Sequence, residues 1–161
     1  DGLHLARALL HCPRIRACEV CEIERFAASV VPDPRGLGQF MLAHRHRYLM
    51  GSASVDARDD GRLAASIFAS LAPEYMACGA FAVRPRVRFP LELAVPYLDP
   101  TLPPLFKGYL RAGGRVCGAP AWDEAFGTAD FLLLLDMRDL APAYARRFVT
   151  SVRVPEIALA A

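Results

Sequence analysis

The only lysine of the chain, Lys107, is four residues before Arg111, in a segment whose flanking prolines and glycines predict a short helix. Pro103-Pro104 suits the start of such a helix and Gly113-Gly114 suits its end. Residues four apart lie on the same face of a helix, so both positive charges are expected on one side. That side suits a carboxylate or an acidic partner. A solvated helix face without a partner is the competing interpretation.

Cys18 and Cys21 form a Cys-x-x-Cys pair, a spacing found in zinc and redox sites. No second pair of Cys or His residues follows at partner spacing, since His44 and His46 stand alone downstream. Apolar alternation around the pair favours a strand in which both thiols act as small hydrophobes. The five cysteines also lack the regular spacing of a disulfide scaffold, which indicates a reducing compartment. We therefore expect no metal site.

Several well-known catalytic motifs are missing from the sequence. There is no Gly-x-Ser-x-Gly elbow, no Walker loop, no Gly-x-Gly-x-x-Gly after a strand and no His-Glu-x-x-His. Hydrolase, nucleotide-phosphate and zinc-protease interpretations therefore lose their main support.

The segment from Leu102 to Phe131 is the most specific part of the chain. It reads Leu-Pro-Pro-Leu-Phe-Lys-Gly-Tyr-Leu-Arg-Ala-Gly-Gly-Arg-Val-Cys-Gly-Ala-Pro-Ala-Trp-Asp-Glu-Ala-Phe-Gly-Thr-Ala-Asp-Phe. It closely resembles the C-terminal half of the ornithine lipid acyltransferases, N-acyltransferases that use acyl carrier protein and are often labelled hemolysin-like. Their pattern reads P-P-L-x-K-G-Y-L-R-x-G-A-x-V-C-G-x-P-A-W-D-x-x-F-x-T-A-D. With similar stretches at 48–54 and 140–148, the resemblance covers roughly residues 16–149.

A weaker match lies upstream. Glu22-Ile-Glu-Arg-Phe-Ala27 resembles the E-L-G-R of this family and the E-L-S-R-F of the related acyl-homoserine lactone synthases, which share a GNAT-like fold. The resemblance implies that Glu22 and Arg25 organise the pocket for the amine and act in catalysis. Glu24 stands where the family usually has a small residue. An ion pair within the strand is the competing interpretation.

The resemblance implies an N-acyltransferase that moves a (3-hydroxy)fatty acyl chain from acyl carrier protein to the amine of ornithine, the first step of ornithine lipid biosynthesis. The donor would be the acyl-phosphopantetheine of the carrier protein, with no permanently bound cofactor. Amine attack on a thioester needs a proton acceptor, hydrogen-bond donors for the oxyanion and a groove for pantetheine. Two alternatives stay open: a signal synthase of the acyl-homoserine-lactone type, and a non-catalytic remnant or binding module.

The donor side can also be placed by resemblance. In GNAT proteins the pantetheine lies along the strand before the main helix, and the helix N-terminus faces the phosphate. The corresponding residues here are Phe26, Ala27, Ser29, Arg35 and Gly38. Because Phe40 replaces the last small residue of the R-x-x-G-x-A loop, the match favours acyl carrier protein over coenzyme A. Lys107 and Arg111 would receive the acidic carrier protein or a substrate carboxylate.

Two aspartates flank a predicted loop between strands. Asp123 and Asp130 suit capping or turn roles, with a direct part in catalysis or in binding the substrate or the acyl carrier as the alternative. The aromatic residues nearby, Trp122, Phe126 and Phe131, are more typical of a core than of an acyl tunnel.

The elements that must position these residues begin with a strand over 16–29. Pro32-Asp33-Pro34 ends it, a helix is expected over 35–47, and a second strand over 48–55. Such a β-α-β unit favours two parallel strands. A helix is predicted from 63 as far as 73 or 75 after an acidic capping loop. The prolines of 84–93 favour a sheet edge or an extended loop there. Strands over 116–122 and 131–137 and a helix over 140–149 follow.

The arginines of the proline-rich edge, Arg84, Arg86 and Arg88, are expected on one side of it. We interpret them as a solvated edge, with a site for an acidic partner as the alternative.

Composition supports one domain over 1–161, of the α/β (α+β) class, with a GNAT-like mixed central sheet flanked by helices. The net charge of +2 gives little attraction to nucleic acid. The longest apolar runs, such as Phe131 to Leu135, are five residues and too short to span a bilayer. The resemblance implies a bacterial, cytoplasmic protein with peripheral contact at the inner face of the membrane. Family members carry a preceding section, so we expect the first strands to be missing and the exposed edge to favour self-association.

Overall fold

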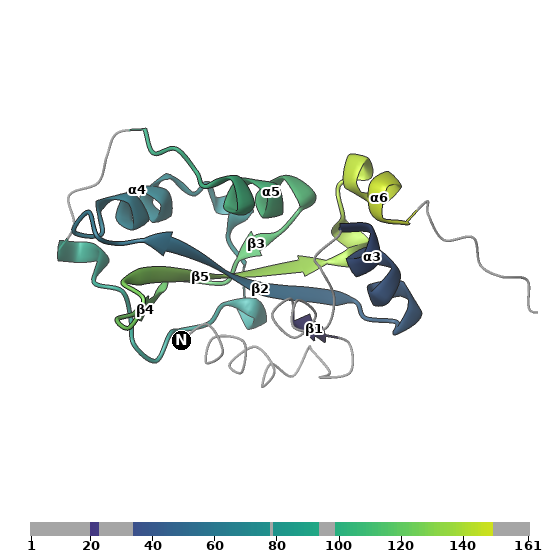
Figure 1. The fold of residues 1–161 in the computed structure, drawn as a ribbon, viewed down its shortest axis with the longest axis horizontal. Coiled ribbons are helices and arrows are strands. Elements are labelled where there is room, and N and C mark those ends of the chain that lie inside the picture. The colour runs from purple at the N-terminus through teal and green to yellow at the C-terminus, as the bar shows by residue number, and fades with distance from the viewer. Residues whose placement is uncertain (1–19, 23–33, 78, 94–98, 150–161) are drawn as a thin grey trace, which may run out of the picture.

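The computed structural model describes residues 20–22, 34–77, 79–93 and 99–149 (Figure 1). The described strands are β1 (Val20–Glu22), β2 (Tyr48–Asp56), β3 (Arg115–Val116), β4 (Ala121–Asp123) and β5 (Thr128–Asp136). The α-helices are α3 (Pro34–Ala43), α4 (Arg62–Ser70), α5 (Pro104–Ala112) and α6 (Pro142–Val149). Short 3₁₀ helices are formed by Pro73–Tyr75, Gly79–Phe81, Leu91–Leu93 and Met137–Asp139.

The strands form one mixed sheet in the order β1-β2-β5-β3, with β4 also paired to β5. β1 is parallel to β2, with Val20 opposite Tyr48, and α3 connects the two strands. The predicted β-α-β unit is therefore confirmed for the described part of its first strand. β2 and β5 are antiparallel over their whole length, from Tyr48 opposite Asp136 to Asp56 opposite Thr128. The mixed α/β class is confirmed, and the architecture is compatible with a GNAT-like fold.

Side chains of β2 and β5 alternate between two apolar layers, as expected for central strands covered on both faces. One layer joins Val55 and Phe131 to Ile67 of α4 and to Phe106 and Leu110 of α5. Figure 1 shows α4 and α5 on this side of the sheet. The opposite layer is built from Tyr48, Met50, Leu132 and Leu134, with Ala77, Phe81 and Val83 packed against them.

The prolines and glycines that flank α5 begin and end the helix as the sequence predicts. The helix begins at Pro104 and is followed by Gly113, which takes the left-handed conformation with φ 105°. The Gly113 and Gly114 amides donate to the carbonyl oxygens of Leu110 and Tyr109, at 3.1 and 2.9 Å. These bonds satisfy carbonyl groups that the end of a helix would leave unpaired.

The predicted strand over 116–122 is in fact two strands, β3 and β4. Gly118 interrupts it with φ 136°, and a Cβ at this position would collide with the carbonyl oxygen of Val83. The close approach of the 79–83 segment therefore breaks the strand. β5 also begins at Thr128 rather than at 131, because the loop is a tight turn over 124–127.

Two predicted helices end earlier than the sequence indicates. The helix expected from 63 as far as 73 or 75 ends at Ser70, and a separate 3₁₀ helix follows at Pro73–Tyr75. The helix expected over 35–47 ends at Ala43, and Arg45 follows with a φ of 55°. The segment expected over 84–93 as an edge or an extended loop is irregular, and a bridge from Arg88 to Ala121 joins it to the sheet. Within the described residues, every helix is too short or too polar to cross a membrane.

Candidate functional site

The predicted catalytic pair is only partly described. Glu22 is the last residue of β1, opposite Met50 in the parallel register. Arg25, together with Phe26, Ala27 and Ser29, lies outside the described residues, as does Cys18. The roles that the resemblance gives to Glu22 and Arg25 remain predictions. What the structure adds is that Glu22 ends a strand of the central sheet beside β2.

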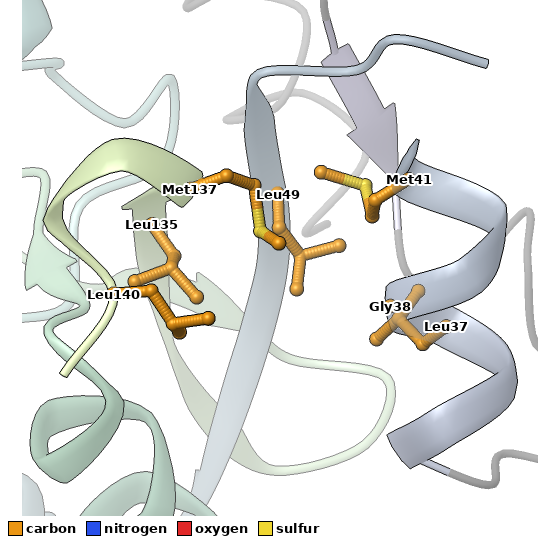
Figure 2. Close-up of a pocket in the computed structure, with 7 residues that line it drawn as sticks. All are labelled: Leu37, Gly38, Met41, Leu49, Leu135, Met137 and Leu140. Atoms are coloured by element: carbon orange, nitrogen blue, oxygen red, sulfur yellow. The ribbon is translucent and has the colours of Figure 1, made fainter. Parts of the chain in front are cut away.

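Gly38 contributes to a small apolar pocket between α3 and the sheet. Figure 2 shows the pocket lined by seven residues: Leu37, Gly38 and Met41 from α3, Leu49 from β2, Leu135 from β5, and Met137 and Leu140 from the segment after it. Its cavity holds about 20 Å³, the space of a single water-sized group. The lining suits methylene groups rather than polar ones. The pocket is too small to act as a tunnel for a long acyl chain. Arg35 belongs to the first turn of the same helix.

The face of the sheet that is turned away from α4 and α5 carries polar side chains beside its apolar layer. Asp130 is 5% exposed and accepts a hydrogen bond from the Thr128 hydroxyl at 3.0 Å. Ser54 is directly opposite Asp130 in the β2–β5 register, and Ser52 is two residues away on the same face of β2. The Ser52 Oγ atom is buried and finds no hydrogen-bond partner within the described part of the chain. Buried polar groups of this kind suit binding of a polar group.

Asp123 has a structural role at the hairpin between β4 and β5. Its Oδ1 atom accepts a hydrogen bond from the Phe126 amide at 3.2 Å, which is the turn role predicted for it. Of the aromatic residues nearby, Phe131 is fully buried and Trp122 packs against the same core. Phe126 is 80% exposed at the tip of the hairpin, so the core interpretation is wrong for this residue.

The two charges of α5 lie on its solvent side. Lys107 and Arg111 are exposed, whereas Phe106 and Leu110 of the same helix face the core. No ion pair of either residue is found with the residues that the structure describes. The expected common face is thus present, and its charge is available to an anionic partner. Arg111 also lies in the last turn, where a cation is favoured by the helix dipole.

A charged cluster at the end of β5 was not predicted from the sequence. Arg47 donates to Asp136 Oδ2 from Nε at 3.0 Å and from Nη2 at 2.6 Å. Arg138 donates to the same carboxylate from its amide and its guanidinium, at 3.0 to 3.3 Å. Burial raises the pKa of Asp136, and the Arg47 guanidinium opposes that rise. The available signal was an aspartate that ends an apolar run and faces an arginine before the partner strand.

Cys117 is excluded as a nucleophile. It is fully buried, and burial raises the pKa of its thiol to about 12. Because the thiolate is the reactive species, we expect iodoacetamide at pH 8 to modify Cys117 in the folded chain at under about 1% of its rate in urea. Peptide-resolved mass spectrometry would measure both rates. Similar rates with and without urea would show that this thiol is accessible.

Comparison with known proteins gives a short similarity to an acyltransferase. The chain is 41% identical over 44 residues to the L-ornithine N(alpha)-acyltransferase of Brucella abortus (strain 2308). This match spans 27% of the chain and only 16% of that protein. Neither a family model nor a solved structure matches the chain.

Proposed function

We propose that this chain acts in an N-acyltransferase that moves a (3-hydroxy)fatty acyl chain from acyl carrier protein to the α-amine of ornithine. The observation that carries the proposal is the 44-residue match to an L-ornithine N(alpha)-acyltransferase. The Leu102–Phe131 segment supports it, since its fixed positions resemble those of the same class of enzyme. The reaction would provide the acylated amino acid from which a membrane lipid is made.

The chemistry consists of addition and elimination at a thioester. The lone pair of the neutral amine adds to the carbonyl carbon, and the carbon–sulfur bond then breaks to release the pantetheine sulfur as a thiolate. The proton lost by the amine passes to a base and from there to the sulfur, so the products are an amide and a free thiol. Glu22 is the residue proposed as that base. Because Cys117 is a buried thiol, the proposal uses direct transfer without an acyl-enzyme at this residue.

The residues proposed to bind acyl carrier protein and its acyl chain are chosen by their charge and polarity. Acyl carrier proteins are acidic, and the exposed pair Lys107 and Arg111 supplies a basic face on α5. The apolar pocket beside Gly38 suits the first methylene groups of an acyl chain. A longer chain would require α3 to move away from the sheet, because the cavity now holds only about 20 Å³.

Amine-dependent thiol release tests the function. The full chain is mixed with 3-hydroxyacyl carrier protein, and free thiol is followed with ornithine, other amino acids or S-adenosylmethionine as the amine. We expect release that depends on ornithine. Release only with S-adenosylmethionine would favour the signal synthase. Carrier-protein binding without release from any amine would favour the non-catalytic binding module.

Reversing the charge of both residues in the Lys107→Glu/Arg111→Glu variant should raise KM for acyl carrier protein about tenfold at low salt, with kcat little changed. Exposed charges mainly steer encounter, so the difference should shrink at high ionic strength. Steady-state kinetics at two salt concentrations would measure it. The matched control is Arg84→Glu/Arg86→Glu, which makes the same charge change on exposed residues of the proline-rich edge. Equal effects of the two double variants would contradict a docking role specific to α5.

A further inference from the structure

A second cavity lies on the other face of the sheet, at the end where β2 begins and β5 ends. Its volume is about 240 Å³, much larger than that of the pocket beside Gly38. It is lined by Tyr48, Ala77, Phe81, Gly113, Arg115, Leu134, Asp136 and Asp139. Of the donor-side residues that the structure describes with their side chains, Gly38, Lys107 and Arg111 are not part of its lining. A cavity of this size suits a small molecule rather than a long chain.

The cavity offers one available anion. Asp136 is already neutralised by Arg47 and Arg138, which bind both of its carboxylate oxygens. Asp139 is different, because its carboxylate has no ion pair or side-chain hydrogen bond with the described residues. An ammonium group entering the cavity would therefore find an uncompensated carboxylate at Asp139.

The cavity also offers one available cation. Arg115 makes a single side-chain hydrogen bond with the described residues, from Nη1 to the Glu74 carbonyl oxygen at 3.2 Å. Its Nη2 and Nε donors remain for a ligand, and a guanidinium is well suited to a carboxylate. Arg115 is exposed and opposite Leu134 in the β3–β5 register, which places it on the cavity side of the sheet.

The two charged residues are held near each other by backbone packing. Gly113, two residues before Arg115, lies so close to Asp139 that a Cβ would come within 2.7 Å of the Asp139 carbonyl oxygen. Tyr48 and Phe81 add aromatic rings whose centroids are 5.9 Å apart. The cavity therefore combines a cation, an anion and an apolar wall, which are the features that recognise an amino acid with a cationic side chain.

We propose that this cavity binds the acceptor amino acid, with its carboxylate on Arg115 and its side-chain ammonium on Asp139. This arrangement leaves the α-amine without a partner and available for acylation. The inference rests on the proposed function, because that function supplies the class of ligand. It adds the residues that select a diamino acid over an amino acid with an uncharged side chain.

Ornithine and norvaline separate the two contacts, since norvaline lacks the side-chain ammonium. Binding of each to the full chain is measured by calorimetry without the acyl donor, and kcat/KM is measured with the donor. Arg115→Gln should weaken binding of both amino acids about 10- to 100-fold, as expected for loss of a charge-assisted hydrogen bond. Asp139→Asn should weaken ornithine alone by a similar factor and bring its preference over norvaline close to one. Arg86→Gln, outside the cavity, is the matched control.

The outcomes distinguish failure of this inference from failure of the proposed function. Acyl transfer to ornithine that is unchanged in Arg115→Gln and Asp139→Asn would overturn the binding site and leave the function standing. Ornithine binding that is lost in these variants, in a chain without acyl transfer, would support the site and reject the function. Absence of ornithine binding by the unmodified chain would overturn the site.

Discussion

Phe106→Ala is expected to lower the free energy of unfolding by about 3–5 kcal/mol, the usual cost of removing a buried phenyl ring and leaving a cavity. Phe106 is fully buried, and its ring meets that of Phe131 edge to face with centroids 5.2 Å apart. This contact joins α5 to the centre of β5, so its loss should loosen the helix that carries Lys107 and Arg111. Urea denaturation followed by circular dichroism would measure the change.

Leu105→Ala is the matched control, because Leu105 directly precedes Phe106 in the same helix and is 62% exposed. Its replacement should change the free energy of unfolding by less than about 0.5 kcal/mol. If both variants lose the same amount of stability, α5 does not pack on the sheet through Phe106 as described. If neither does, the apolar layer under α4 and α5 is not the main core.

Glu22→Gln is expected to lower kcat for acyl transfer about 100-fold or more, the usual contribution of a general base. The amide keeps the size of the side chain but cannot accept the proton from the attacking amine. KM for acyl carrier protein should stay the same, because the charges on α5 that are proposed to bind it are unchanged. Single-turnover kinetics with saturating donor would isolate the chemical step.

Glu24→Gln gives the matched control for this experiment. It removes a carboxylate from the same short segment, at a position where the enzymes that this segment resembles usually have a small residue. We expect kcat to stay within about twofold of the unmodified value, because nothing assigns this carboxylate to proton transfer. Full activity of Glu22→Gln, or an equal loss in Glu24→Gln, would show that Glu22 is not the base.

Much of the fold could be predicted because local signals and tertiary structure agree. Proline before α5 and glycine after it define the helix through backbone preferences that no neighbour overrides. The order of strand, helix and strand leading to β2 likewise gave a parallel pair. The prediction was wrong at Gly118, because the break there comes from the carbonyl of Val83, 35 residues away in the sequence. Local propensity carries no information about such a contact.

The candidate site was less predictable for a similar reason. The common face of Lys107 and Arg111 follows from helical spacing alone. The cavity with Arg115 and Asp139 forms only when the end of β5, the start of β2 and the 77–81 segment come together. In the sequence, these residues are far apart, and no local pattern links them. In the sequence, Asp136 is only the residue that follows an apolar run, and its two arginine partners become evident from strand register and packing.

The most direct test of the account is mass spectrometry of the reaction product. The full chain is incubated with long-chain 3-hydroxyacyl carrier protein and ornithine, and both the acylated amino acid and the freed thiol are quantified. The account predicts Nα-acyl-ornithine and free thiol in equal amounts, with neither formed when ornithine is omitted. Folded protein that yields no acylated product from ornithine or any other amino acid would contradict it.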